Sequence, residues 1–252
     1  FAVNNSNLTI NISNSNNDCL LTTTNVQKVG GFIGSVLNNK NIINGTTINF
    51  TNCENHKEIK SSNGSNVGGF IGFVFNILNV SAEHCENKGN ILINNTGENI
   101  AVGGFIGFFT DDMNVVIDPK NVLTGTNNSG SVTVEGNPST ATVGGLIGAI
   151  HEIDGYLRNY SIQIINCSNN GEINVTDVKN DTQIGGLIGN MTKNGYFNVE
   201  IKGCSNKATI SAFSSPNTCI VGGLIGWVSR NGRSNLTISD CNNCLLYTSD
   251  AA

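Results

Sequence analysis

One six-residue string limits what this chain can fold into, because it occurs six times. It reads Val-Gly-Gly-Phe-Ile-Gly in the first three copies and Val-Gly-Gly-Leu-Ile-Gly in the last three, with Ile for Val in the fifth. The copies start 38, 35, 41, 41 and 37 residues apart, at residues 29–34, 67–72, 102–107, 143–148, 184–189 and 221–226. Repeats with such a period indicate one supersecondary unit stacked on copies of itself.

A second block accompanies each hexamer and is anchored on a cysteine slot. The slot holds Cys53, Cys85, Thr126, Cys167, Cys204 and Cys241. Two residues after the slot comes an asparagine, at Asn55, Asn87, Asn128, Asn169, Asn206 and Asn243. Six residues after the slot comes Ile or Val, at Ile59, Ile91, Val132, Ile173 and Ile210. We expect a degenerate copy before the first hexamer, with Leu8, Ile10 and Ser13 in register and Cys19 in the Ile position.

Three short segments in each unit alternate apolar and polar residues, which is typical of strands. They are the hexamer, the apolar pair before the cysteine, and the stretch around the following Ile. No segment has helical periodicity with caps, so helix should be scarce. Propeller blades would need four strands, whereas stacked asparagines can bond along a solenoid axis. The sequence predicts an all-β, right-handed parallel β-solenoid (β-helix) of six to seven coils, with three short strands per 35–41-residue coil.

The hexamer glycines need an explanation, because glycine normally weakens a strand. A single bulky residue between glycines indicates close approach of another backbone or a tight corner. Nucleotide binding is the competing interpretation, but it requires a glycine-rich turn that opens a helix, with further ligands downstream. Neither accompanies the six hexamers, so we assign the glycines a structural role.

Composition excludes several function classes. Charged residues make up 12% of the chain and the net charge is −5, so no basic surface for nucleic acid is expected. No run of 18 apolar residues occurs, so we expect no membrane contact by this segment. The 30 glycines and 44 asparagines come largely from the repeated unit.

The string Val-Gly-Gly-Leu-Ile-Gly at 143–148, followed by Asn-Cys-Ser-Asn-Asn-Gly-Glu-Ile at 166–173, resembles the GLUG repeat. The resemblance covers nearly all of residues 1–243. The chain departs from the family pattern in three ways: it has Cys where the family has Ser, Ile where the family has Val, and longer repeat units. It implies a place in a large secreted or cell-surface protein, because GLUG repeats occur in adhesins and in non-catalytic regions of some bacterial surface proteases.

The two ends of the sequence lead to expectations about domains. The chain starts at Phe1 with no visible signal peptide. Residues 244–252 resemble translated read-through of a sequencing adapter, and we expect them to be an artefactual tail. Residues 1–243 should then form a single solenoid array with a degenerate coil at 1–28. On this interpretation the chain is a fragment of a longer protein.

Seven cysteines lie outside the tail, and an odd number argues against a fully paired framework. The cysteine slot suits a small buried side chain, so we expect mostly free thiols, although stacked neighbours are close enough to bridge. Cys53, His56, His84 and Cys85 are zinc-type ligands that stacking would bring near one another. Because the histidines occupy different positions relative to the slot, we expect structural roles, with no metal or cofactor.

Candidate catalytic groups are sparse. Asp111 and Asp112 are adjacent, with Asp118 near them, but adjacent strand residues point to opposite faces and make a poor acid–base pair. The arginines are Arg158, Arg230 and Arg233, and His151 has no nucleophile motif around it. We therefore expect no catalytic residues. About fifteen Asn-x-Ser/Thr sequons occur, among them Asn7, Asn44, Asn79, Asn174 and Asn235.

Three functional hypotheses follow. The first is a non-catalytic repeat module of an extracellular or cell-surface protein, acting as a rigid stalk or an adhesive surface for a host or surface protein or glycan. The second is a substrate-docking scaffold of a surface protease or carbohydrate-active enzyme whose catalytic domain lies elsewhere. The third is an intracellular interaction scaffold, which free thiols would suit.

Overall fold

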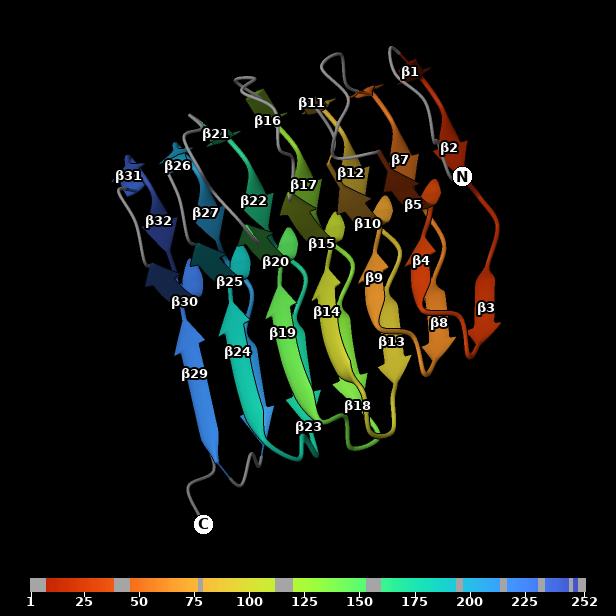
Figure 1. Cartoon of the computed structure of the whole chain (residues 1–252), viewed down its shortest axis with the longest axis vertical. Helices are drawn as coiled ribbons and strands as arrows, with labels where there is room; N and C mark the ends of the chain where they lie inside the picture. Colours follow the sequence, from red (N-terminus) through yellow and green to blue (C-terminus); the bar gives the residue numbers. More distant parts are fainter. Residues whose placement is uncertain are drawn as a thin grey trace.

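The computed structural model describes residues 8–38, 46–76, 79–111, 120–152, 160–193, 197–213, 217–230, 234–244 and 247–248. These residues form stacked coils of parallel strands, with the N-terminal coil at one end of the stack and the C-terminal coil at the other (Figure 1). The predicted parallel β-solenoid is confirmed. Five sheets run along it, and each holds six or seven strands, which agrees with the expected number of coils.

Each sheet takes one strand from every coil that contributes to it. Sheet A holds β1 (Thr9–Ser13), β6 (Thr47–Thr51), β11 (Asn79–Glu83), β16 (Lys120–Thr124), β21 (Tyr160–Ile165), β26 (Phe197–Lys202) and β31 (Ser234–Ser239). Sheet B holds β2 (Asn16–Asn17), β7 (Glu54–Asn55), β12 (Glu86–Asn87), β17 (Asn127–Asn128), β22 (Ser168–Asn169), β27 (Ser205–Asn206) and β32 (Asn242–Asn243). Sheet C holds β3 (Leu21–Thr24), β8 (Ile59–Ser62), β13 (Ile91–Asn94), β18 (Val132–Glu135), β23 (Ile173–Thr176), β28 (Ile210–Phe213) and β33 (Tyr247–Thr248).

The hexamers supply the two remaining sheets. Sheet D holds β4 (Lys28–Gly30), β9 (Asn66–Gly68), β14 (Asn99–Gly103), β19 (Thr140–Gly144), β24 (Asp181–Gly185) and β29 (Thr218–Gly222). Sheet E holds β5 (Ile33–Leu37), β10 (Ile71–Phe75), β15 (Ile106–Asp111), β20 (Ile147–Glu152), β25 (Ile188–Lys193) and β30 (Ile225–Arg230). A full coil therefore contains five strands rather than the expected three, because two of the three predicted segments bend.

The first bend divides every hexamer after its first glycine. A Cβ on Gly68 would lie 2.1 Å from the Ile71 carbonyl oxygen, and one on Gly72 would lie 2.6 Å from the carbonyl oxygen of Gly34 in the preceding coil. Both distances are far below van der Waals contact, so backbone packs directly on backbone here. The predicted role of the hexamer glycines in close backbone approach is confirmed.

The second bend lies just before the cysteine slot. The residue there has a left-handed backbone in every coil, with φ between 49° and 64° at Asn14, Asn52, His84, Gly125, Asn166, Gly203 and Asp240. Glycine, asparagine, aspartate and histidine are the residues that adopt this conformation most readily. The bend explains why the apolar pair and the asparagine lie on separate strands.

Two apolar cores run along the solenoid. Sheets A and E enclose the first, which includes Phe50, Phe70 and Phe105, all at most 1% exposed. Sheets C and D enclose the second, which includes Ile59 and Val67. Parallel pairing is in register, so Ile48 lies between Ile10 and Val80 of the neighbouring coils. Similar residues therefore stack on one another along each core.

A continuous asparagine ladder separates the two cores. Its members are Asn17, Asn55, Asn87, Asn128, Asn169, Asn206 and Asn243, and each side-chain amide donates to the side-chain oxygen of the next at 2.7–3.2 Å. The second glycine of each hexamer packs against this ladder. A Cβ on Gly69, for example, would come within 2.6 Å of the Asn87 side-chain amide. The predicted stacking of asparagines along the axis is confirmed.

The register expected for the first coil is wrong by two residues. Ile10 and Ile12 align with Ile48 and Phe50, Asn17 aligns with Asn55, and Leu21 takes the position expected for Cys19. At the other end, Tyr247 and Thr248 pair with Ile210 and Ser211, so sheet C continues into the segment expected to be an artefactual tail.

Candidate functional site

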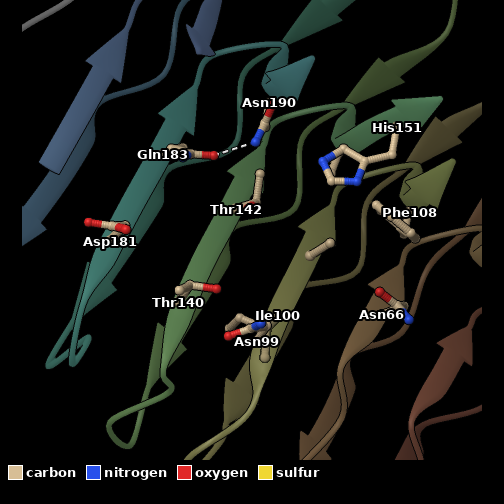
Figure 2. Close-up of a pocket in the computed structure, with 12 residues that line it drawn as sticks. Asn66, Asn99, Ile100, Phe108, Thr140, Thr142, His151, Asp181, Gln183 and Asn190 are labelled. Atoms are coloured by element: carbon tan, nitrogen blue, oxygen red, sulfur yellow. Dashed lines mark hydrogen bonds between the residues drawn. The ribbon is translucent and has the colours of Figure 1, made fainter. Parts of the chain in front are cut away.

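A cavity of about 390 Å³ opens in the angle where sheets D and E meet. Figure 2 shows its walls: one is made by β9, β14, β19 and β24, and the other by β15, β20 and β25. The residues that line it are Asn66, Asn99, Ile100, Ala101, Phe108, Thr140, Thr142, Ala149, His151, Asp181, Gln183 and Asn190.

Strand alternation explains why most of these side chains face outward. In sheet D the hexamer Val points into the second core, so its neighbours on either side point away from that core. In sheet E the hexamer Ile and the residue three positions after it point into the first core. Residues two positions after that Ile (Phe108, Ala149, Asn190) and, in one coil, four positions after it (His151) line the cavity. The two outward rows face each other across the glycine bend.

Aromatic rings occupy one end of the cavity wall. Phe108 stacks against Phe73 of the preceding coil, with ring centroids 5.6 Å apart and planes inclined by 23°. The His151 ring meets Phe108 edge-on at 5.3 Å. Burial lowers the pKa of the His151 imidazole, so the ring is neutral at neutral pH and presents one donor and one acceptor. Beside it in register, the buried Thr110 hydroxyl has no hydrogen-bond partner among the described residues.

Amides and hydroxyls occupy the other end. The Asn190 amide donates to the Gln183 side-chain oxygen at 2.5 Å across the bend, as drawn in Figure 2. The Thr192 hydroxyl donates to the Asn190 side-chain oxygen at 2.8 Å. Asp181 is the one carboxylate among the described lining residues, and none of these residues is Lys or Arg. The cavity combines ring faces with neutral donors and acceptors.

Few of the described lining residues are groups that covalent catalysis uses. The described lining residues include the hydroxyls of Thr140 and Thr142 but no Ser or Cys, and they contain no pair of carboxylates. Nucleophilic catalysis needs a nucleophile within hydrogen-bond reach of a base, and hydrolysis of a glycosidic bond generally needs two carboxyl groups. What the lining offers is stacking and hydrogen bonding without a net positive charge.

The structure does not bring the four zinc-type candidates together. His56 bonds Glu54 and also Asp18, the latter at 2.7 Å, and these two hydrogen bonds raise the pKa of the imidazole. The side chain of His84 is 65% exposed, and its backbone is left-handed, as is that of the residue before the cysteine slot in all the other coils. This backbone requirement accounts for a histidine at position 84. Cys53 and Cys85 are fully buried. Within the described residues, no group of three or more His, Cys, Asp or Glu side chains could hold a metal ion.

The cysteine slot has a second requirement besides small size. The side chain in every coil donates to the carbonyl oxygen two residues upstream, at 2.9–3.4 Å, from Ser15, Cys53, Cys85, Thr126, Cys167, Cys204 and Cys241. A thiol or hydroxyl satisfies this geometry, which explains Thr126 in the third complete unit. All eight cysteines, each within the described residues, are unpaired.

Several other candidates lie outside the described residues. These are Asp112, Asp118, Arg158, Arg233 and the sequons Asn7 and Asn44. Asp111 ends β15 and Arg230 ends β30. Asn235 is exposed and bonds Asn198, whereas Asn174 is half-buried on sheet C. Of the sequence-predicted candidates that the structure describes, His151 alone lies in the cavity.

Sequence reasoning missed the other lining residues, although a signal was present. They lie immediately outside the hexamer, where residue type changes from coil to coil while the hexamer itself hardly varies. Searches against family models, curated proteins and solved structures found no match for this chain. The part of the chain that the structure describes contains no long apolar helix of the kind that crosses a bilayer.

Proposed function

We propose that this chain is a non-catalytic repeat module of a large extracellular or cell-surface protein, where it acts as a rigid stalk with an adhesive surface. The observation that carries the proposal is the cavity between sheets D and E, whose lining differs in every coil. Rigidity is supported by the parallel ladders and by the asparagine ladder, which together join each coil to the next. The resemblance to GLUG repeats supports the location.

The alternative is a substrate-docking scaffold for a protease or carbohydrate-active enzyme whose catalytic domain lies outside this sequence. The same cavity would then hold substrate for that domain, and the described lining residues favour binding over catalysis. An intracellular scaffold is a third possibility, supported by the eight unpaired cysteines, because disulfides form preferentially in oxidising compartments.

Adhesion can be tested directly with beads coated with the full chain and flowed over cultured cell layers. We expect attachment above that of uncoated beads, and reduced attachment when the cavity carries Phe108→Ala and Gln183→Ala. A matched control carries Phe213→Ala and Gln163→Ala, which remove an exposed aromatic on sheet C and a half-buried glutamine on sheet A. Attachment equal to that of uncoated beads on every cell type would refute the adhesive role.

A further inference from the structure

We propose that the cavity between sheets D and E binds a linear, uncharged oligosaccharide laid along the solenoid axis. This inference rests on the proposed adhesive function, because it names the class of ligand that the same surface would take.

The shape of the cavity favours an extended chain. Its sheet D wall spans four successive strands, and strands in a sheet lie about 4.8 Å apart, so the outer two are about 14 Å apart. A volume of about 390 Å³ distributed over that length is long and narrow. A compact ligand would use only part of it.

The charge of the cavity lining distinguishes among the polymers that could bind there. The described lining has one carboxylate, Asp181, and neither Lys nor Arg. Nucleic acids and acidic glycans need basic side chains to neutralise their charge. An uncharged chain brings no such requirement, and the carboxylate can accept hydrogen bonds from hydroxyl groups.

The backbone argues against an extended peptide. Peptides that bind to sheets usually add a strand to an exposed edge and form main-chain hydrogen bonds. Here the strands run across the axis, and each strand of β14, β19 and β24 pairs with a neighbour on both sides. The cavity therefore offers a peptide no free strand edge.

The side chains that remain match the chemistry of a sugar. Hydroxyl groups along a saccharide both donate and accept, as do Asn66, Thr142, Gln183 and Asn190, which lie in the two rows that flank the bend. The neutral His151 ring adds a further donor or acceptor. The Phe108 ring, which stacks on Phe73, adds apolar surface for the C–H groups of a sugar, while Lys28 Nζ lies over the Phe73 ring at 4.2 Å.

The test is a titration of the full chain with four uncharged hexasaccharides: cellohexaose, xylohexaose, mannohexaose and chitohexaose. Hexagalacturonate and an uncharged extended decapeptide serve as comparison ligands. The side-chain resonances of the three histidines are followed by NMR, and affinities come from calorimetry. We expect at least one hexasaccharide to bind with a Kd of about 1 mM or tighter. The His151 resonances should shift while those of His56 and His84 stay in place.

Variants provide the second arm. Phe108→Ala with Gln183→Ala should weaken that affinity by about tenfold or more, whereas the control pair Phe213→Ala with Gln163→Ala should leave it unchanged. The histidine shifts in the unaltered chain test the site even if the cavity variant fails to fold.

Three results would overturn the inference: no hexasaccharide binds at millimolar concentration, binding leaves His151 unshifted, or only the acidic glycan or the peptide binds. Bead attachment that persists without hexasaccharide binding would refute the oligosaccharide as the ligand but would leave the proposed adhesive function unaffected. Loss of both would refute both.

Discussion

Replacing Asn128 with alanine tests whether the asparagine ladder holds the coils together. Asn128 is fully buried between the two cores. Its amide donates to the Asn169 side-chain oxygen at 2.8 Å and to the Gly130 carbonyl oxygen at 2.9 Å, and its own oxygen accepts from Asn87 at 2.8 Å. The substitution removes three hydrogen bonds and leaves the Asn169 oxygen buried without that donor.

The expected cost follows from these contacts. A net loss of about 1 kcal/mol for each of the three hydrogen bonds, with about 1–3 kcal/mol for a buried group left unsatisfied, predicts that the free energy of unfolding falls by about 4–6 kcal/mol. Asn49→Ala is the matched control, because Asn49 also bonds the stacked asparagine of the adjacent coil, Asn11, at 2.8 Å but on the solvent-exposed face. Exposed substitutions of this kind usually change stability by less than about 0.5 kcal/mol.

Urea unfolding followed by far-ultraviolet circular dichroism measures both changes. Repeat arrays can unfold in stages, so amide hydrogen exchange of the strands β12, β17 and β22 provides a local readout. In Asn128→Ala these strands should exchange faster than in the unaltered chain. The reasoning is refuted if Asn128→Ala and Asn49→Ala lower the unfolding midpoint equally, since burial would then contribute nothing to the ladder.

Three further predictions concern the bend, the histidines and the thiols. Gly107→Ala should destabilise the fold by about 1–3 kcal/mol or more in urea unfolding, because its Cβ would lie 2.6 Å from the Gly72 carbonyl oxygen. Gly34→Ala should cost less, because the nearest atom to its Cβ is 3.1 Å away; equal costs would contradict the prediction. By NMR titration, His56 should have a pKa above its ordinary value and His151 one below it. The stability that His56 contributes is therefore present at low pH and lost as pH rises through its folded-state pKa. Protonation of His151 instead lowers stability as pH falls below its unfolded-state pKa. A His151 pKa above that of His56 would refute the assignments. Iodoacetamide should label exposed Cys19 rapidly and buried Cys85 only after unfolding, because burial raises the pKa of Cys85 to about 11 and excludes the reagent; equal labelling rates in the native chain would contradict this.

The sequence predicts the stacked parts of this fold well, because stacking forces equivalent residues into equivalent environments. Asn128 and its counterparts recur because each amide needs an identical partner one coil away. The glycines recur because backbone packs on backbone at each bend. Such requirements repeat with the coil and leave a periodic pattern, which a single sequence reveals.

The first coil shows where a short pattern is ambiguous. Leu8, Ile10 and Ser13 match the apolar spacing before the slot, but so do Ile10, Ile12 and Ser15. Only the second choice places Asn17 in the ladder, where its amide donates to Asn55 at 2.7 Å. The asparagine, which must bond its counterpart in the next coil, is a stronger guide to register than the apolar pair.

The cavity is harder to predict, because its position depends on the angle between sheets D and E. Asn66 and Asn190 look like ordinary exposed strand residues in the sequence, and no repeat relates them. They line one space only because each hexamer bends after its first glycine. Periodicity indicates which residues face outward, but it does not indicate which two outward rows face each other.

The same bend separates what the fold requires from what a ligand could select. At each hexamer the first two glycines leave no room for a Cβ, and the Val and Ile positions are filled by core residues. The outward rows on either side carry none of these constraints, yet the bend brings them close enough for Asn190 to bond Gln183 seven residues earlier. Substitutions in these rows therefore alter the cavity while leaving both cores and the asparagine ladder in place. A stack of nearly identical coils can in this way present a different combination of donors, acceptors and rings at every step along its axis.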